Sequence, residues 1–304
     1  MTFDHKVFRI GGETASALAA GKPVVALEST VIAHGLPHPQ NLETARRLER
    51  IVKNAQATPA TIAILDGKLC VGLDEDQIRH IAETKDVRKI STRDLPVAVA
   101  QGCDGATTVA STIWIAHRAG IKVLATGGIG GVHRGDLADV SADLPELART
   151  PMVVVCSGAK LVLDLPATRE WLETYGVTVV GYQCHEMPAF YSRSSGLAVD
   201  AVVNSAEEVS DLFAAQRELG LESALLVTVP VPTEFEVSSK LLEKVLEESL
   251  HEAETRGIKG RDVTPFLLAR MSEQSDGATL RANIALLENN ARVAAEIAVA
   301  LSSS

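Results

Sequence analysis

The chain has 304 residues, of which 46% are hydrophobic and 22% are charged. This composition is typical of a globular protein and excludes a collagen-like or largely disordered chain. The chain contains 29 lysine and arginine residues against 39 aspartate and glutamate residues, which gives a net charge of −10. An acidic surface disfavours non-specific binding to nucleic acid or to an anionic membrane, so we expect neither partner.

Short apolar runs alternate with segments of helical periodicity along the chain. The expected strands, in chain order, are residues 24–27, 61–65 with 69–72, 122–125, 152–155, 178–181 and 224–229. The expected helices are residues 41–53, 107–119, 168–175, 206–219, 240–256, 264–273 and 280–301. Strands separated by helices of this length predict a three-layer α/β/α sandwich with a mostly parallel central sheet.

After Pro232 the pattern becomes purely helical, which predicts a helical C-terminal tail over about 236–304. No linker, low-complexity tract or repeat of roughly 20 to 50 residues divides the chain. We therefore expect one domain over residues 1–304, with the helical tail packed on the sheet of that domain.

The first residues, MTFDHKVFRIGGE, lack the basic and apolar segments of a signal peptide. No apolar run reaches the roughly 18 to 20 residues that cross a bilayer. The cysteines are widely spaced and form no CxxC pair; they are Cys70, Cys103, Cys156 and Cys184. We interpret them as reduced thiols and expect a cytoplasmic protein.

Two ionisable side chains follow apolar runs that predict strands. Glu28 follows PVVAL, and Lys160 follows MVVVCSGA. Because ligands of open parallel sheets bind where strands end, both positions are candidates for function. A carboxyl group there could be a general acid, and partial desolvation of a lysine favours the free amine that Schiff-base chemistry needs. Each could equally be a solvated or capping loop residue.

A glycine-rich segment, ATGGIGGVHRG, follows the apolar run that ends at residue 125. Its glycines would let backbone N–H groups approach an anion closely, and His133 and Arg134 at its end could add positive charge. The segment is neither a Walker A motif nor a GxGxxG motif. A phosphate site and a purely structural turn therefore both remain open.

Asp139 and Asp143 lie close together in a loop that also carries Ser141. Carboxylate and hydroxyl oxygens are hard donors, which suit Mg²⁺ or Mn²⁺. Two aspartates in a loop are also common as solvated turn residues. The pattern therefore makes a divalent metal site possible without requiring one.

Two further groups of residues carry weaker signals. His34 and His38 have the i, i+4 spacing that suits zinc on a helix, but Pro37 and Pro39 argue against a helix there. No third zinc ligand is evident, so we expect no zinc site. We interpret Cys156 as a packed small hydrophobic residue and not as a nucleophile.

Six long segments identify a family resemblance. In chain order they are ALESTVIAHGLPHPQNLETA, RKISTRDLP, GCDGATTVASTIWIAHRAGIKVLATGGIGGVHRG, DVSADLPELARTPMVVVCSGAK, VVGYQCHEMPAFY and ANIALLENNARVAAEIA. Together they resemble the pseudouridine-5′-phosphate glycosidase family. The match covers almost the whole chain and follows the order of the family.

The resemblance implies reversible cleavage of the C–C glycosidic bond of pseudouridine 5′-phosphate to uracil and ribose 5-phosphate. It implies that Lys160 is the nucleophile that becomes attached to ribose C1′ and that Glu28 protonates the ring oxygen. It also implies a divalent ion, usually Mn²⁺, held by Asp139, and a homotrimer. The positions that match substrate-contacting residues are Lys89, Val109, Thr126, Ser141, Ala142, Asp143 and Asn283, the last a candidate contact to the base.

Two other classes of protein remain open on the residues alone, because a fold does not decide function. A Schiff-base lyase or aldolase that acts on a phosphosugar would use the same lysine, but would leave the uracil-facing residues and the metal loop without a role. A non-catalytic phosphosugar-binding protein would need no lysine at the end of a strand.

Overall fold

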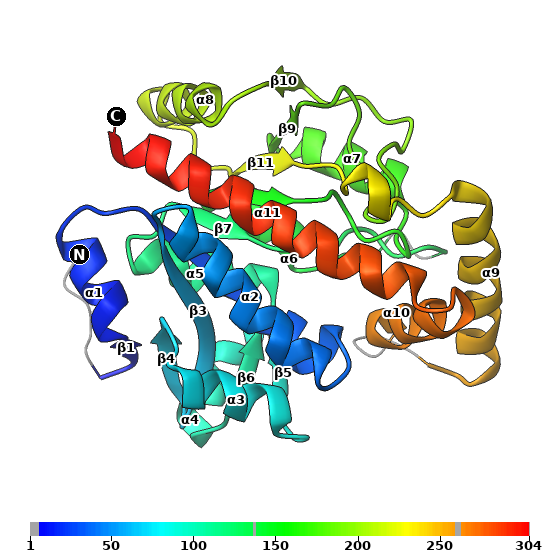
Figure 1. Ribbon diagram of the computed structural model, residues 1–304, viewed down its shortest axis with the longest axis horizontal. Coiled ribbons are helices and arrows are strands. Elements are labelled where there is room, and N and C mark those ends of the chain that lie inside the picture. The colour runs from blue at the N-terminus through cyan, green and yellow to red at the C-terminus, as the bar shows by residue number, and fades with distance from the viewer. Residues whose placement is uncertain (1–5, 136–137, 259–262, 304) are drawn as a thin grey trace.

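One large sheet forms the centre of the molecule in the computed structural model, which describes residues 6–135, 138–258 and 263–303 (Figure 1). Its strands are β1 (Phe8–Ile10), β2 (Val24–Glu28), β3 (Thr58–Leu65), β4 (Lys68–Val71), β5 (Arg88–Ile90), β6 (Gly105–Thr107), β7 (Val123–Ala125), β8 (Val153–Cys156), β9 (Thr178–Tyr182), β10 (Ala201–Val203) and β11 (Leu225–Thr228). The main strand order is β1-β4-β3-β2-β7-β8-β11-β9-β10, with β6 paired to β3 and β5 paired to β6. Only the pairings of β3 with β4 and with β6 are antiparallel among the described strands. The sheet is therefore mostly parallel, as predicted.

The middle strands β2, β7 and β8 are parallel neighbours and are buried throughout. Leu27 pairs with Ala125, and Ala125 pairs with Val155. Apolar, β-branched residues on both faces of each strand explain why this part of the sheet lies between two layers of helices. The register brings the carboxyl ends of all three strands to one edge of the sheet.

Helices cover both faces of the sheet. The helices are α1 (Gly12–Ala19), α2 (Gln40–Asn54), α3 (Glu75–Glu83), α4 (Leu95–Gln101), α5 (Val109–Arg118), α6 (Asp143–Leu147), α7 (Leu165–Thr174), α8 (Ala206–Glu218), α9 (Ser239–Thr255), α10 (Val263–Gln274) and α11 (Ala278–Ser303). Three short helical turns are η1 (Val31–Gly35), η2 (Thr92–Asp94) and η3 (Thr233–Phe235). Figure 1 shows α2 and α11 in front of the sheet and α5 and α6 behind it. This arrangement confirms the predicted three-layer α/β/α sandwich.

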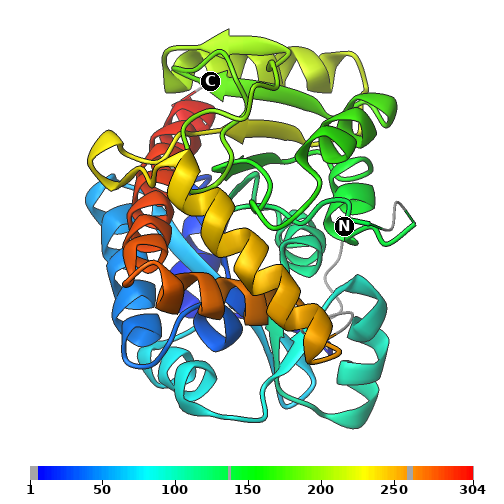
Figure 2. The same cartoon turned by 90° about the vertical axis from the view of Figure 1, so that its right-hand side faces the viewer.

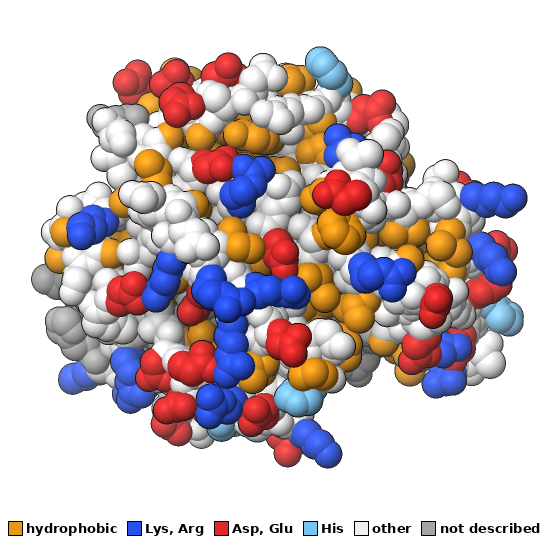
Figure 3. Space-filling view, viewed as in Figure 1, with side chains coloured by type: hydrophobic (Ala, Val, Ile, Leu, Met, Phe, Trp, Pro, Cys, Tyr) orange, Lys and Arg blue, Asp and Glu red, His pale blue; other side chains and the backbone are white. Residues whose placement is uncertain are grey.

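The last helix, α11, crosses the centre of the sheet and packs against β2, β7 and β8 (Figure 1). Its buried face is rich in alanine, including Ala291, Ala294 and Ala295, and these small side chains let the helix approach the strands closely. Arg47 of α2 forms an ion pair with Glu288 of α11, with 3.0 Å between Nε and Oε1. Figure 3 shows Lys and Arg side chains gathered over the middle of this face, despite the net negative charge of the chain.

The other two helices of the predicted tail lie at one side of the molecule. Figure 2 shows α9 running across this side with α10 packed against it. Helix α10 also contacts α11 and η1, which places it beside the edge where β2 ends. No helix of the described residues is long and apolar enough to cross a membrane.

Several elements differ from those expected. Strands β1, β5, β6 and β10 have three residues each and were not predicted, whereas β7, which is equally short, was expected from its apolar run. Helix α3 was also missed, although Asp74 and Gln77 form a capping box at its start. The expectation that no helix carries both His34 and His38 is confirmed, although His34 itself lies in the π-helical turn η1. That turn ends at Gly35, so His34 and His38 do not share a helix.

Candidate active site

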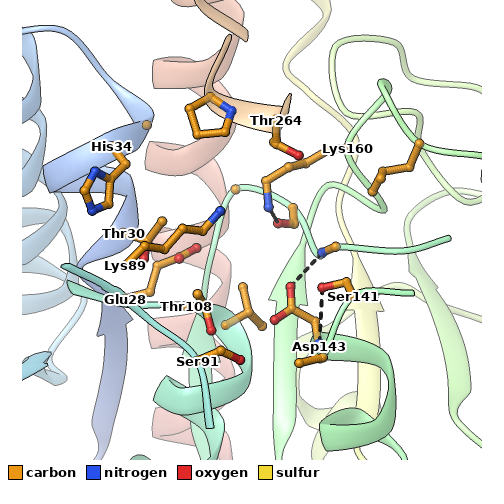
Figure 4. A pocket seen from close by; sticks show the side chains of 18 of the residues that line it. Glu28, Thr30, His34, Lys89, Ser91, Thr108, Ser141, Asp143, Lys160 and Thr264 are labelled. Carbon is orange, nitrogen blue, oxygen red and sulfur yellow. Dashed lines mark hydrogen bonds between the residues drawn. The ribbon is translucent and has the colours of Figure 1, made fainter. Parts of the chain in front are cut away.

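A cavity of about 340 Å³ opens at the carboxyl ends of β2, β7 and β8 (Figure 4). This volume is within the range of small-molecule sites, and the place is the one expected for a parallel sheet. The predicted site residues that line it are Glu28, Lys89, Val109, Asp139, Ser141, Ala142, Asp143, Lys160 and Asn283. Thr126 is not among the lining residues, but its side chain reaches Glu28. The structure thus brings together residues that are up to 255 positions apart, from 28 to 283.

Glu28 is the last residue of β2, and only 8% of it is exposed. Its carboxyl group accepts a hydrogen bond from the hydroxyl of Thr126, the residue after β7. Burial is the main influence on its pKa and raises it, while Lys160 and the Thr126 hydrogen bond act in the opposite direction. The raised pKa keeps Glu28 protonated at a higher pH than an ordinary glutamic acid, which is the property of a proton donor.

Lys160 reaches the cavity from the turn after β8. Within this turn Gly158 has a φ of +79°, and a Cβ there would lie 2.0 Å from the carbonyl oxygen of Pro188, so only glycine fits. The backbone N–H of Lys160 donates to Ile129 O at 3.1 Å. Its half-buried ammonium group donates to Gly128 O at 2.7 Å. Figure 4 shows this side chain pointing into the same cavity as Glu28.

The glycine-rich turn after β7 makes several of its hydrogen bonds within the protein. The N–H of Ile129 donates to Gly158 O at 3.1 Å, and the N–H of Gly130 donates to Asp143 Oδ2 at 2.8 Å. A Cβ on Gly130 would lie 2.2 Å from Ser141 Oγ, so this glycine allows the turn to pack closely against the next loop. The hypothesis of an anion cradle made by this turn is weakened, because these two N–H groups already have acceptors.

Asp143 joins two walls of the cavity. Its Oδ1 accepts the N–H of Ala110, in the first turn of α5, at 2.9 Å, and its Oδ2 accepts the N–H of Gly130. The residue is 6% exposed and lies where the helix dipole favours a negative charge. Asp143 therefore holds the start of α5 against the glycine-rich turn, and both of its oxygens are engaged in doing so.

Asp139 has a different environment. Its side chain is 52% exposed, lines the cavity and lies 3.6 Å from His133 Nδ1, measured from Oδ2. The two aspartates of this loop are therefore not equivalent. The carboxylate of Asp139 is open to a ligand from solution, whereas the carboxylate of Asp143 accepts hydrogen bonds from two backbone N–H groups.

One wall of the cavity carries cationic and hydroxyl groups. Lys89, in the middle of β5, points toward Glu28 in Figure 4, and Ser91 and Thr108 lie near it. Thr108 is the N-cap of α5, and Val109 is its first residue. Asp143 already occupies the positive end of the α5 dipole, so the groups of this wall that favour an anion are the lysine and the two hydroxyl groups.

Several lining residues were missed from the sequence. Phe190 lines the cavity with a φ of +63°, an unusual backbone conformation for a bulky residue that often marks a functional site. His34 comes from η1, and Thr264, Pro265 and Leu268 come from α10. Phe190 and His34 lie within the segments that carry the family resemblance. Membership of those segments was the only sign in the sequence that these two residues belong to the site.

Cys156, at the end of β8, is fully buried, and burial raises the pKa of its thiol to about 12. A thiol in that state is not nucleophilic, which agrees with its interpretation as a packing residue. All four cysteines are free. Within the described part of the chain, no three His, Cys, Asp or Glu side chains gather in a way that could hold a metal ion.

The fold and the cavity define an α/β protein in which a lysine, a buried carboxyl group of raised pKa and a wall that favours an anion share one small site. Residues 13–300 match the model of the indigoidine synthase A like protein family. The chain is 51% identical to the pseudouridine-5′-phosphate glycosidase of Caldanaerobacter subterraneus over 98% of this chain and 97% of the relative. It is 53% identical to the protein of the same name from Herpetosiphon aurantiacus over 95% of this chain and 96% of the relative. The chain belongs to the pseudouridine-5′-phosphate glycosidase family, which confirms the resemblance.

Two solved structures share this fold. The prealnumycin C-glycosynthase AlnA, in complex with ribulose 5-phosphate, superposes with a TM-score of 0.90 at 40% identity and covers 98% of this chain and 97% of its own. An indigoidine synthase A-like protein from Thermotoga maritima superposes with a TM-score of 0.91 at 40% identity, with 99% of each chain covered.

Substitution Asp143→Asn tests the link between α5 and the glycine-rich turn. An amide has one acceptor oxygen and would direct an NH₂ group at one of the two N–H donors, so we expect a loss of about 1.5 to 3 kcal/mol in the free energy of unfolding. Urea denaturation measures this loss. Asp76→Asn, at a side chain that is 92% exposed, is the control and should change stability by about 0.5 kcal/mol or less. Equal stability of the two variants would contradict the linking role.

Proposed function

We propose that this protein reversibly cleaves the C–C glycosidic bond of pseudouridine 5′-phosphate to uracil and ribose 5-phosphate. The observation that carries the proposal is the presence of Lys160 and the buried Glu28 in one cavity, next to a wall that favours an anion. Relatives about half identical over nearly the whole chain are named for this activity. The residues and the relatives thus support the same reaction.

The chemistry explains why an amine is needed. The base of an N-glycoside can leave once it is protonated or stabilised, but a carbon-linked base has no comparably easy heterolysis. In our proposal Glu28 donates its proton to the ring oxygen, and the furanose opens into conjugation with uracil. The ammonium group of Lys160 loses a proton, and the free amine then adds at C1′.

The C–C bond breaks in the second half of the reaction. Uracil C5 takes up a proton, and the electron pair of the C1′–C5 bond moves to the base as the sugar becomes an iminium on Lys160. Water adds at C1′, and loss of the amine releases the aldehyde of ribose 5-phosphate. The same steps in reverse would form the C-glycoside.

We infer that the two ends of the substrate lie in separate parts of the cavity. The phosphate group would lie against Lys89, Ser91 and Thr108 at the start of α5, where charge-assisted hydrogen bonds are available. Uracil would lie near Asn283, which is buried on α11 beside the glycine-rich turn and can pair with the edge of a base. Lys160 and Glu28 would then lie between the two ends, where C1′ and the ring oxygen must be.

We infer that Asp139 holds a divalent ion, Mn²⁺ by family resemblance. Its half-exposed carboxylate at the cavity fits an ion that keeps most of its waters, with His133 and Ser141 as neighbouring donors. Such an ion would supply positive charge that helps to bind an anionic substrate. Assembly as a homotrimer and a cytoplasmic location stay predictions from resemblance and composition.

Borohydride trapping tests the role of Lys160. Reduction in the presence of ribose 5-phosphate should attach the sugar covalently to Lys160, because borohydride reduces an iminium to a stable amine. Peptide mass spectrometry locates the adduct. Lys160→Ala should lose the adduct and turnover while the protein stays folded. Lys122→Ala, at an exposed lysine, is the control and should keep both. An adduct elsewhere, or an active Lys160→Ala variant, would refute the assignment.

Glu28→Gln tests the proton donor. It should lower kcat by roughly 10²- to 10⁴-fold with a smaller effect on KM, since the amide keeps the shape but has no acidic proton. In the wild type, cleavage should slow as pH rises through the pKa of Glu28, and burial places this decline above the pH of an ordinary glutamic acid. The decline should be absent from the residual activity of Glu28→Gln. An identical pH profile in both proteins would exclude Glu28 as the donor.

Asp139→Ala tests the metal. It should lower kcat/KM by roughly 10²-fold or more, since a bound ion supplies several kcal/mol of charge stabilisation, and excess Mn²⁺ should restore the activity poorly. Asp211→Ala, at an exposed aspartate on α8, should respond to Mn²⁺ as the wild type does. Full activity of the wild type after treatment with a chelator would contradict the requirement for a metal.

A further inference from the structure

One three-residue segment contacts both reactive side chains of the cavity. Thr126 donates its hydroxyl hydrogen to Glu28, and Gly128 accepts a hydrogen bond from the Lys160 ammonium group at 2.7 Å. The segment follows β7, the strand between those that lead to Glu28 and Lys160. The position of residues 126–128 therefore determines where both groups lie.

Asn290 of α11 binds the same segment. Its Nδ2 donates to Thr126 O at 2.8 Å, with a longer contact to Gly127 O at 3.4 Å. The same amide exchanges hydrogen bonds with the hydroxyl of Ser157, at 3.1 Å from Nδ2 and 3.3 Å from Oδ1. Ser157 is the first residue after β8, in the turn that leads to Lys160. Asn290 thus joins the ends of two neighbouring strands.

An asparagine is unfavourable at this position unless its hydrogen bonds are needed. Asn290 is completely buried inside a long helix, where Ala291, Leu286 and Val293 are also fully buried. Asparagine is a poorer helix former than leucine, and burial of an amide is costly unless it is hydrogen-bonded. A leucine would suit the helix and the apolar layer better. The amide of Asn290 donates to Thr126, whose hydroxyl group binds Glu28, and to Ser157, which begins the turn that leads to Lys160.

We propose that Asn290 is a positioning residue for the reaction, which fixes residues 126–128 so that Glu28 and Lys160 face the substrate together. The role rests on the proposed function of the cavity. It acts through Thr126 and Gly128, since Asn290 is not among the residues that line the cavity.

Asn290→Leu is the direct test, with Asn289→Leu as the matched control. Asn289 is the half-buried neighbour on the same helix, and its amide donates to Pro230 O at 3.4 Å, away from the segment. We expect Asn290→Leu to lower kcat by roughly 10- to 100-fold with little change in KM, since a misplacement of about 1 Å can have that effect. Asn289→Leu should keep the wild-type kcat.

The pH profile separates positioning from a general loss of stability. The hydrogen bond from Thr126 lowers the pKa of Glu28, so weakening it should move the alkaline decline of cleavage to higher pH. If the substitution only reduced the fraction of protein molecules that are folded and active, the rate would be lower at every pH and this decline would not move. Thermal unfolding and circular dichroism define a temperature at which Asn290→Leu and Asn289→Leu are both folded. If Asn290→Leu does not fold, Asn290→Ser takes its place.

The outcomes distinguish this role from the proposed function. A reduced kcat and a displaced pH decline in the Asn290 variant, with neither in Asn289→Leu, would support positioning. Wild-type kcat and pH profile in the folded Asn290 variant, whatever its melting temperature, would overturn it. If the wild type itself released no uracil from pseudouridine 5′-phosphate, the proposed function would fail instead.

Discussion

The parallel register of β2, β7 and β8 is the constraint on which the site depends. Leu27, Ala125 and Val155 lie level with one another across these strands, so the residues that follow them emerge side by side. Glu28 emerges from one strand, and the turn that carries Lys160 follows another. A shift of one residue in the pairing would turn the side chains of a strand to its opposite face and would separate the two groups.

The same burial that stabilises the sheet also sets the chemistry of Glu28. Desolvation favours the protonated carboxyl group and raises its pKa, whereas the nearby lysines and the Thr126 hydroxyl favour the carboxylate. Because the net effect is a raised pKa, Glu28 stays protonated to a higher pH than an ordinary glutamic acid, as the proposed role of proton donor requires. A carboxyl group of similar position but full exposure would be ionised at neutral pH and could not donate.

Sequence reasoning predicted the parts of this structure that leave a regular pattern. Apolar runs located β2, β7 and β8, and with them the strand ends that carry Glu28 and Lys160. Strand β5, which carries Lys89, was not predictable, because two of its three residues are charged and it forms no apolar run. The engagement of Asp143 with two backbone N–H groups and the contact of α10 with the cavity depend on tertiary packing, which no local pattern encodes.

The most direct test of the account is the stoichiometry of products from pseudouridine 5′-phosphate. The purified protein, supplied with Mn²⁺, should release uracil and ribose 5-phosphate in equal amounts, and the two products mixed at high concentration should regenerate the nucleotide. Chromatography with ultraviolet detection follows uracil, and an aldehyde assay follows the sugar phosphate. Absence of uracil, or release of a sugar phosphate by cleavage within the sugar chain, would contradict C–C glycosidic cleavage.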